Sequence, residues 1–178
     1  TPIFEWLHKN SVETLIPCEI RFVRLPGPKN LVRATVTDIS ERKKAQQELS
    51  KFKLGIENSD DAVFMTDING IIQYANMGFE KVYGYNPEEV IGQTPRILKS
   101  GLTPQEQYSQ FWGTLLSGGT VTSEITNKAK DGRLVTIAGT NSSILDEQGK
   151  VLGFLAVHHD MTFAKRAEDA IKRRNEYL

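Results

Sequence analysis

The alternation of apolar and polar residues divides the chain into two strand-rich stretches, each followed by a charged segment with helical spacing. Residues 14–37 alternate as strands do, and Leu25-Pro-Gly-Pro28 interrupts them, so the pattern predicts a hairpin. Residues 41–56 then place apolar side chains at spacings of four, three and four, at Ala45, Leu49, Phe52 and Ile56. This spacing predicts a helical linker with a short coiled-coil seam.

The second stretch begins with two short strands at 62–67 and 71–76, separated by the tight-turn residues Asn69-Gly70. Capping residues and helical spacing then indicate several short helices, of which the longest is expected at 103–117, after a loop at 92–101. Three longer strands complete the order, at 121–129, 133–145 and 151–158. The predicted order is therefore two strands, several short helices and three strands.

The same strand-to-helix exit occurs twice, as Asp38-Ile-Ser40 and as Asp160-Met-Thr162, which are 122 residues apart. A repeat of this kind indicates a tandem of related modules. In each copy the acidic and hydroxyl side chains are expected to accept hydrogen bonds from free backbone amides at the start of the next helix. Asp38, Ser40, Asp160 and Thr162 are therefore predicted to tie a strand to a helix, either as signal-relay residues or as simple caps.

The positions of the two exits predict how the chain is divided. Too little chain precedes Asp38 to bury a core alone, so residues 1–40 are expected to be the end of a domain that is cut away or completed by another chain. A helical linker follows at 41–56, and residues 57–162 form the one complete domain. A final signalling helix is expected at 163–178, with an apolar seam at Ala164, Ala167, Ile171 and Leu178.

Charge and cysteine content limit the partners and the compartment. Basic and acidic residues each number 22, and a formal net charge of zero gives no broad attraction to nucleic acid or to an anionic membrane. No run approaches the roughly 18 apolar residues of a membrane span. The single cysteine, Cys18, excludes an intrachain disulfide and suits a reducing compartment, so a cytoplasmic protein is expected.

The residues do not support catalysis by this chain. There is no Gly-x-Ser-x-Gly nucleophile motif, and Cys18 has only distant histidines. Two of the three histidines, His158 and His159, are adjacent, which matches no usual zinc motif, and on a strand they would point to opposite faces. Gly118-Gly119 lacks the lysine and hydroxyl residue of a phosphate-binding loop. A regulatory module is expected in place of an enzyme.

Several short motifs occur in the order typical of one family: Tyr74-Ala-Asn-Met-Gly-Phe79, Gly84-Tyr-Asn-Pro-Glu-Glu-Val-Ile-Gly92, Ile97-Leu-Lys-Ser-Gly101, Trp112, Lys130-Asp-Gly132 and Asp160-Met-Thr162. Together they resemble a PAS domain with its trailing PAC segment. The resemblance implies an α+β fold, in which a five-stranded antiparallel sheet carries short helices on one face around a pocket used for sensing and dimerisation. Residues 1–40 resemble the last three strands of a preceding PAS domain.

Within this family the sequence discriminates among cofactors. A haem sensor would need an axial ligand, usually a histidine on the long helix, and residues 103–117 contain none. The LOV photoreceptors carry a reactive cysteine where this chain has Pro95, which excludes cysteinyl-flavin photochemistry. The other residues around Pro95 resemble those of the FAD-binding redox sensors of nitrogen-fixation and methane-oxidation regulators, which share the Ile-Leu-x-Ser-Gly loop.

The resemblance implies a set of cofactor-binding residues: Phe79, Arg96, Leu98, Trp112, Asn127 and His158. Arg96 would meet the cofactor phosphate or form a surface salt bridge. Asn127 would pair with the polar edge of the flavin ring or lie on an exposed sheet face. His158, at the place of a flavin-contacting glutamine in LOV proteins, would donate to a flavin atom or sit exposed at a sheet edge. Trp112 would stack on the cofactor or belong to the core.

Two departures from the flavin pattern leave the ligand open. Val121 stands where the FAD redox sensors have a tryptophan, and Ile137 stands where LOV proteins have a second asparagine, so the pocket is expected to be more apolar than a flavin site. The alternatives are FAD, a small apolar or aromatic effector, and no ligand.

The expected function is that of a sensory and dimerisation module in a bacterial signal-transduction protein. It would form a homodimer through the PAS domain and the flanking helices, and would act on an effector domain in the same chain. The family makes a histidine kinase the commonest effector, with a diguanylate cyclase or another PAS domain as alternatives. A rival hypothesis is a ligand-free structural spacer that relays an upstream signal.

Overall fold

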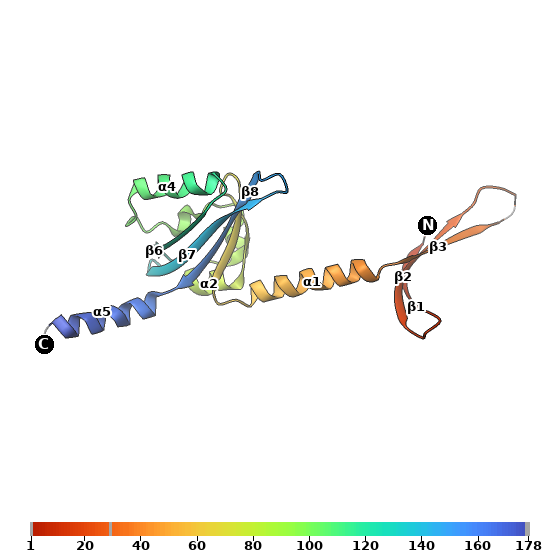
Figure 1. The fold of residues 1–178 in the computed structure, drawn as a ribbon, viewed down its shortest axis with the longest axis horizontal. Helices are drawn as coiled ribbons and strands as arrows, with labels where there is room; N and C mark the ends of the chain where they lie inside the picture. Colours follow the sequence, from red (N-terminus) through yellow and green to blue (C-terminus); the bar gives the residue numbers. More distant parts are fainter. Residues whose placement is uncertain (1, 29, 177–178) are drawn as a thin grey trace. The chain divides into compact units, whose positions relative to one another are not determined.

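The computed structural model describes residues 2–28 and 30–176, which form two compact units, 1–54 and 55–178 (Figure 1). The division falls within helix α1 (Ser40–Glu57), which corresponds to the helical linker predicted at 41–56. The predicted seam residues Leu49 and Phe52 of this helix are both more than two-thirds exposed. Leu178, predicted as the last seam residue of the second helix, lies outside the described residues.

The first unit is a three-stranded antiparallel sheet that leads into α1. Its strands are β1 (Ile3–Lys9), β2 (Leu15–Arg24) and β3 (Val32–Asp38), in the order β1-β2-β3. The hairpin predicted at 14–37 is confirmed as β2 and β3, and β1 pairs with the other edge of β2. Among the described residues of this unit, only Cys18 and Ile39 are buried hydrophobic side chains. The sheet therefore has no hydrophobic core of its own.

The second unit contains the predicted five-stranded antiparallel sheet, in the order β5-β4-β8-β7-β6. The strands are β4 (Ala62–Asp67), β5 (Ile72–Ala75), β6 (Thr120–Lys128), β7 (Leu134–Leu145) and β8 (Val151–Asp160). Strand β8 lies in the middle of the sheet, and its neighbour β4 is about ninety residues away in sequence. The predicted α+β fold class and sheet are confirmed.

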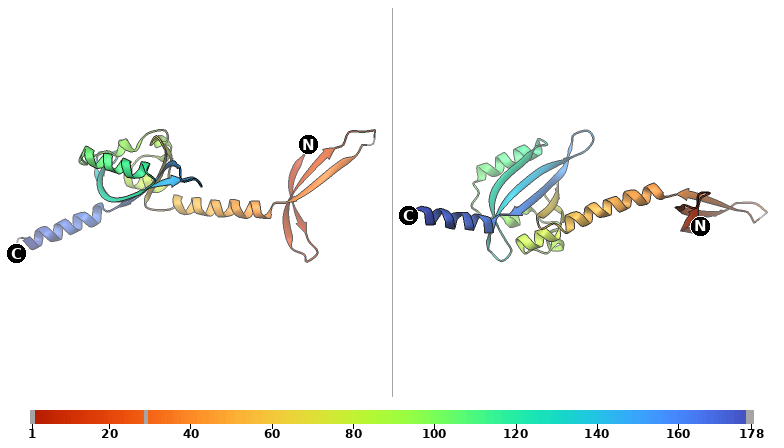
Figure 2. Two further views of the ribbon diagram at one scale, coloured as in Figure 1. Left: turned by 45° about the horizontal axis from the view of Figure 1, so that its top comes forward. Right: turned by 60° about the horizontal axis from the view of Figure 1, so that its bottom comes forward.

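Short helices follow β5, and their start signals are read directly from the sequence. They are α2 (Met77–Tyr83), α3 (Pro87–Val90), a 3-10 turn η1 (Pro95–Leu98) and the longer α4 (Gln105–Leu116), which packs beside β6 and β7 (Figure 2). Asn76 caps α2 by accepting from the Phe79 amide, and Asn86 forms a capping box with Glu89. The stretch predicted as loop, 92–101, contains η1 because Pro95 supplies a helical φ at its first position.

The core of the second unit lies between the central strands and α2. Phe64 on β4 meets Phe79 on α2 edge to face, with ring centroids 5.4 Å apart, and Tyr83 packs on Phe79 one helical turn later. Asn76 is fully buried and ties three segments together, because its amide donates to the carbonyls of Ile56 and Asp61 and accepts from the Val63 amide. The chain leaves this unit through α5 (Thr162–Glu176).

Candidate functional site

A cavity of about 1310 Å³ lies between the sheet, η1 and α4. Five of the six residues predicted to bind a cofactor line this cavity: Arg96, Leu98, Trp112, Asn127 and His158. The sixth, Phe79, is fully buried in the core and touches the cavity wall only through Phe64. The structure therefore brings residues from η1, α4, β6 and β8 to one pocket.

His158 lies deep in the pocket and is 4% exposed. Its Nδ1 is 2.7 Å from the Tyr83 hydroxyl, and the same hydroxyl oxygen accepts a hydrogen bond from the Asn127 side-chain amide at 2.9 Å. Its Nε2 is buried and has no hydrogen-bond partner within the described part of the chain. An unsatisfied buried polar atom carries a free-energy penalty, so an unpaired polar atom on a residue that lines a cavity is suited to a ligand.

The alternative placement of His158 at an exposed sheet edge is wrong. β8 is the middle strand of the five, paired with β4 on one side and with β7 on the other. His159 points to the opposite face, is exposed, and pairs through Nδ1 with Asp61 at 2.6 Å. The predicted split of the two histidines between opposite faces is confirmed.

Burial sets the protonation of the polar group at the base of the pocket. Desolvation lowers the pKa of His158 to about 4, because the protonated imidazolium is disfavoured away from water. Desolvation also raises the pKa of the Tyr83 hydroxyl, against a smaller lowering effect of the Asn127 hydrogen bond. Both side chains are therefore neutral at pH 7.

Asn127 and the η1 loop are fixed to each other. Asn127 is buried and forms an isolated bridge with Lys99, and the Ser100 hydroxyl bonds to the Thr126 carbonyl. Asn127 thus lies on the pocket face, and its alternative placement on an exposed sheet face is wrong. Arg96, from the same loop, is exposed at the cavity and forms no ion pair with any described residue. The surface salt bridge that was the alternative role for Arg96 is therefore not observed.

The aromatic wall of the pocket comes from α4 and β8. The Trp112 ring is half-buried and meets Phe154 edge to face at 5.4 Å, while Phe111 contacts its other side at 5.3 Å. Trp112 therefore packs against the fold and also presents ring surface to the cavity. The two interpretations of Trp112 are compatible.

Three residues near the site were missed from the sequence: Asn141, which lines the cavity, and Tyr83 and Gly139, which lie beside His158. Asn141 is buried and lines the cavity, whereas Ile137, four residues earlier on the same face of β7, is fully buried in the core. The alternation of β7 could have placed Asn141 on this face. Asn141 therefore adds a third polar side chain to Asn127 and His158 in the lining of the cavity.

The two exits make the predicted acidic contact. Asp160 Oδ1 accepts from the Thr162 amide at 2.8 Å, and Asp38 Oδ1 accepts from the Ser40 amide at the same distance. The Thr162 hydroxyl does not cap the helix as expected, because it accepts from the Thr136 amide on the neighbouring strand β7 at 3.0 Å. The Asp160 carboxylate thus fixes the turn between β8 and α5, and the Thr162 hydroxyl ties this turn to strand β7.

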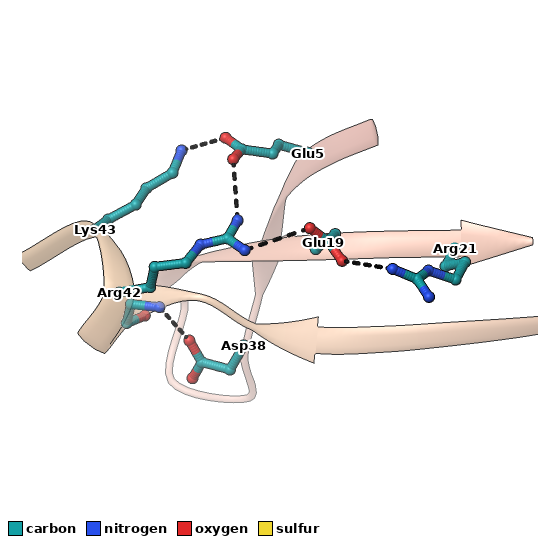
Figure 3. A network of polar contacts seen from close by, with 7 residues as sticks. Glu5, Glu19, Arg21, Asp38, Arg42 and Lys43 are labelled. Carbon is teal, nitrogen blue, oxygen red and sulfur yellow. Dashed lines mark hydrogen bonds and ion pairs between the residues drawn. The ribbon is translucent and has the colours of Figure 1, made fainter. Parts of the chain in front are cut away.

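Both exits also share an ion pair that sequence reasoning missed. Lys43, in the first turn of α1, pairs with Glu5 on β1, and this contact lowers the pKa of Glu5 (Figure 3). Lys165, in the first turn of α5, pairs with Glu124 on β6 at 3.0 Å, which raises the pKa of Lys165. In the first unit Arg42 adds contacts of 3.4 Å to Glu5 and to Glu19. Each exit is therefore held to the far strand of its sheet as well as to the adjacent one.

The strand registers show that the two exits belong to equivalent sheets. Cys18 on β2 pairs with Asp38, and Ile137 on β7 pairs with Asp160. In both copies the residue after the acid donates its amide to the middle strand, to the carbonyl of Pro17 or of Thr136. β1-β2-β3 and β6-β7-β8 are thus two copies of one arrangement.

Among the described residues, no cluster of histidine, cysteine or acidic side chains could hold a metal ion. In the same part of the chain, no helix is long and apolar enough to cross a bilayer.

Comparison with known proteins identifies the family. The profile of the PAS fold matches residues 50–161, and the chain therefore belongs to the PAS family of regulatory sensor modules. The fold of a PAS domain crystal structure from Colwellia psychrerythraea aligns with a TM-score of 0.57 and 28% identity, over 65% of this chain and 98% of that one.

Relatives of known role are signalling and regulatory proteins. A nitrogen fixation regulatory protein of Klebsiella pneumoniae is 31% identical over 127 residues, which is 71% of this chain and 26% of the relative. The signal transduction histidine-protein kinase AtoS of Escherichia coli is 28% identical over 149 residues, 83% of this chain and 24% of the relative. The chain thus spans about a quarter of these relatives.

Proposed function

We propose that residues 55–176 form a sensory module that binds a small ligand in the pocket at His158 and relays its state through the Asp160 exit to an effector domain in the same protein. The observation that carries the proposal is His158, which lines a cavity of about 1310 Å³ and whose buried Nε2 has no hydrogen-bond partner among the described residues. Pockets of this kind, apolar with a few convergent polar groups, are typical ligand sites.

FAD is the ligand we propose first, because the chemistry of the lining fits it. The Trp112 and Phe154 rings offer apolar surface for a planar ring system, and Asn127 and His158 offer polar contacts to its edge. Arg96, exposed at the cavity, is available for a phosphate. Bound flavin would supply reversible redox chemistry, and the chain would then sense redox state. An aromatic effector of similar size is the alternative ligand.

We place this module in a cytoplasmic bacterial signalling protein that works as a homodimer. The similarity to AtoS supports a histidine kinase as the effector, with a diguanylate cyclase as the alternative. The exposed apolar side chains along α1, Leu49 and Phe52, and Ile171 on α5 support pairing of the flanking helices.

Residues 1–40 are proposed as the last three strands of a preceding PAS domain. The matching registers and the repeated Lys–Glu pair support this assignment. Two strand positions that line the pocket in the second unit, Ile125 and His158, correspond to Trp6 and Val36 in the first, which are at least half exposed. A sheet with such a face is suited to being covered by further structure.

A ligand-free relay is the second candidate function, and one set of contacts favours it. The end of α1 is bonded into the core of the second unit, because Asn76 donates to the Ile56 carbonyl at 2.7 Å and Tyr74 donates to Glu57 at 2.8 Å. A displacement of α1 would therefore reach the sheet without any ligand.

An absorption spectrum of the purified protein separates the two functions. Bound oxidised flavin gives bands near about 450 nm, and His158→Leu should reduce the bound flavin while His159→Leu, on the opposite face, should not. A colourless protein that releases no flavin on denaturation and gains none on incubation with FAD contradicts the flavin proposal. Equal flavin content in the two variants contradicts the assignment of the site.

A further inference from the structure

The hydrogen bonds around His158 favour one of its two neutral tautomers. The Tyr83 hydroxyl oxygen accepts the Asn127 N–H, and the same hydroxyl lies 2.7 Å from His158 Nδ1. With the hydroxyl as the donor to Nδ1, the neutral imidazole carries its own proton on Nε2. In this tautomer the buried, unpaired Nε2 is a donor.

The surroundings of the ring hold it in this orientation. Phe64 meets the imidazole edge to face, with centroids 5.1 Å apart and planes at 87°. On the other side, a Cβ at position 139 would lie 3.1 Å from Cδ2 and 3.4 Å from Nε2 of His158. The ring edge that carries Nε2 thus fits closely over Gly139, where a glycine leaves room for it.

We infer that the pocket selects planar ligands that present a hydrogen-bond acceptor, a heteroaromatic nitrogen or a carbonyl oxygen, to His158 Nε2, and that Tyr83 enforces this selection by fixing the tautomer. The inference rests on the proposed ligand-binding function. A ligand that presents a donor would place two N–H groups against each other and leave both without an acceptor, which costs affinity. Tyr83 is in this sense a positioning residue, since it acts on the ligand through His158.

The tautomer is measured directly by NMR of the ligand-free protein labelled with 15N-histidine at pH 7.5. His158 is assigned by its loss in His158→Gln. The expected result is a protonated Nε2 and an unprotonated Nδ1. Tyr83→Phe, which keeps the ring and removes the hydroxyl, should give a mixture of tautomers, whereas Tyr74→Phe, whose hydroxyl bonds to Glu57 outside the pocket, should change nothing. A protonated Nδ1 in the wild-type protein overturns the inference, even if Tyr83→Phe fails to fold.

The ligand class is tested with three fused bicyclic probes of similar size: isoquinoline, which offers an acceptor nitrogen, indole, which offers a donor, and naphthalene, which offers neither. Titration followed by the His158 Nε2 signal should show isoquinoline binding about tenfold more tightly than indole, and the preference should be lost in Tyr83→Phe. Equal affinities for the three probes would mean that Nε2 serves an ordered water, and they overturn the inference. Failure of isoquinoline to bind overturns it also.

These measurements fail separately from those of the proposed function. A protein that lacks flavin yet shows the Nε2 tautomer and the isoquinoline preference retains the inference and rejects FAD. A flavin-containing protein with the opposite tautomer retains the function and rejects the role of Tyr83.

Discussion

The chain contains one sheet arrangement in two settings, and the difference separates what the exit needs from what the pocket needs. β1-β2-β3 and β6-β7-β8 pair in equivalent registers and end in the same acid-to-amide contact of 2.8 Å. Yet among the described residues of the first unit only Cys18 and Ile39 are buried hydrophobic side chains, while the second sheet is covered by α2 and extended by β4 and β5.

The comparison shows that the exit is a local device and the pocket is not. The exit uses residues of three strands and one helical turn, all of which are present in both units. The pocket requires η1 and α4, which have no counterpart among the described residues of the first unit. In the first sheet, Val36 occupies the register place of His158. The described part of the first unit therefore contains the strand-to-helix exit without a counterpart of His158.

The largest expected difference between the units is in hydrogen exchange. Amides of β8, in the covered sheet, should exchange only on global unfolding, whereas amides of β2 should exchange through local opening. We expect β8 to be protected by about 3 kcal/mol more than β2, which is more than about a hundredfold in rate. If the amides of β2 were protected as well as those of β8 in dilute monomeric protein, the expected difference in stability between the two sheets would be contradicted. Protection of β2 that rises with protein concentration would show that a second copy covers its face.

Two glycines of the second unit test how closely its parts are packed. A Cβ at Gly78, in α2, would lie 2.1 Å from the Asp61 carbonyl oxygen, so Gly78→Ala should lower the free energy of unfolding of the second unit by about 3 kcal/mol. Gly55→Ala, in α1, meets nothing within 4 Å and should raise helix stability by up to about 1 kcal/mol. Chemical denaturation followed by tryptophan fluorescence measures both. A neutral Gly78→Ala would mean that the backbone near Asp61 yields easily.

The pH dependence between about pH 6.5 and pH 4 should be largest in the unit that contains His158. Burial lowers the pKa of His158 to about 4 from an ordinary 6.5, so the unfolded state binds the proton more readily. Stability from the neutral imidazole is therefore full above about pH 6.5 and is lost as the pH falls towards 4, by up to about 3 kcal/mol. Denaturation at pH 7 and pH 4.5, compared with His158→Gln, isolates this contribution. The same pH dependence in the variant would assign it to other groups.

The smallest effects are expected at the exits. Asp160→Ala should remove the Thr162 amide contact and cost about 1 kcal/mol of local stability at the start of α5, seen as faster exchange of that amide. In the first unit, hydrogen bonds from Ser40 lower the pKa of Asp38, so its contribution is present above about pH 4 and is lost as the pH falls below that. Asp38→Ala should abolish this acid-induced change at the start of α1. A relay role for Asp160 further requires that Asp160→Ala uncouple signal from output in the full-length protein while ligand binding persists, and loss of both would indicate structural damage.

Local patterns predicted most of the elements, and the features that they missed have two different origins. Asn76 and Asn86 signalled the starts of α2 and α3 through their capping side chains, and the alternation along β8 placed the two adjacent histidines on opposite faces. The η1 turn was missed because a 3-10 turn of four residues has almost no periodicity to detect. The Lys165–Glu124 pair was missed because its partners come from segments about forty residues apart.

The sequence by itself determined the order of elements, the repeated exit and the family, since capping, alternation and motif spacing are properties of neighbouring residues. Of the six residues that the sequence predicted to bind a cofactor, five line the pocket. Only the tertiary structure decided that Tyr83 bonds to His158 and that Nε2 remains unpaired, because these atoms belong to residues 75 positions apart, on α2 and β8. Contacts of that kind depend on how strands and helices pack, and no local pattern encodes them.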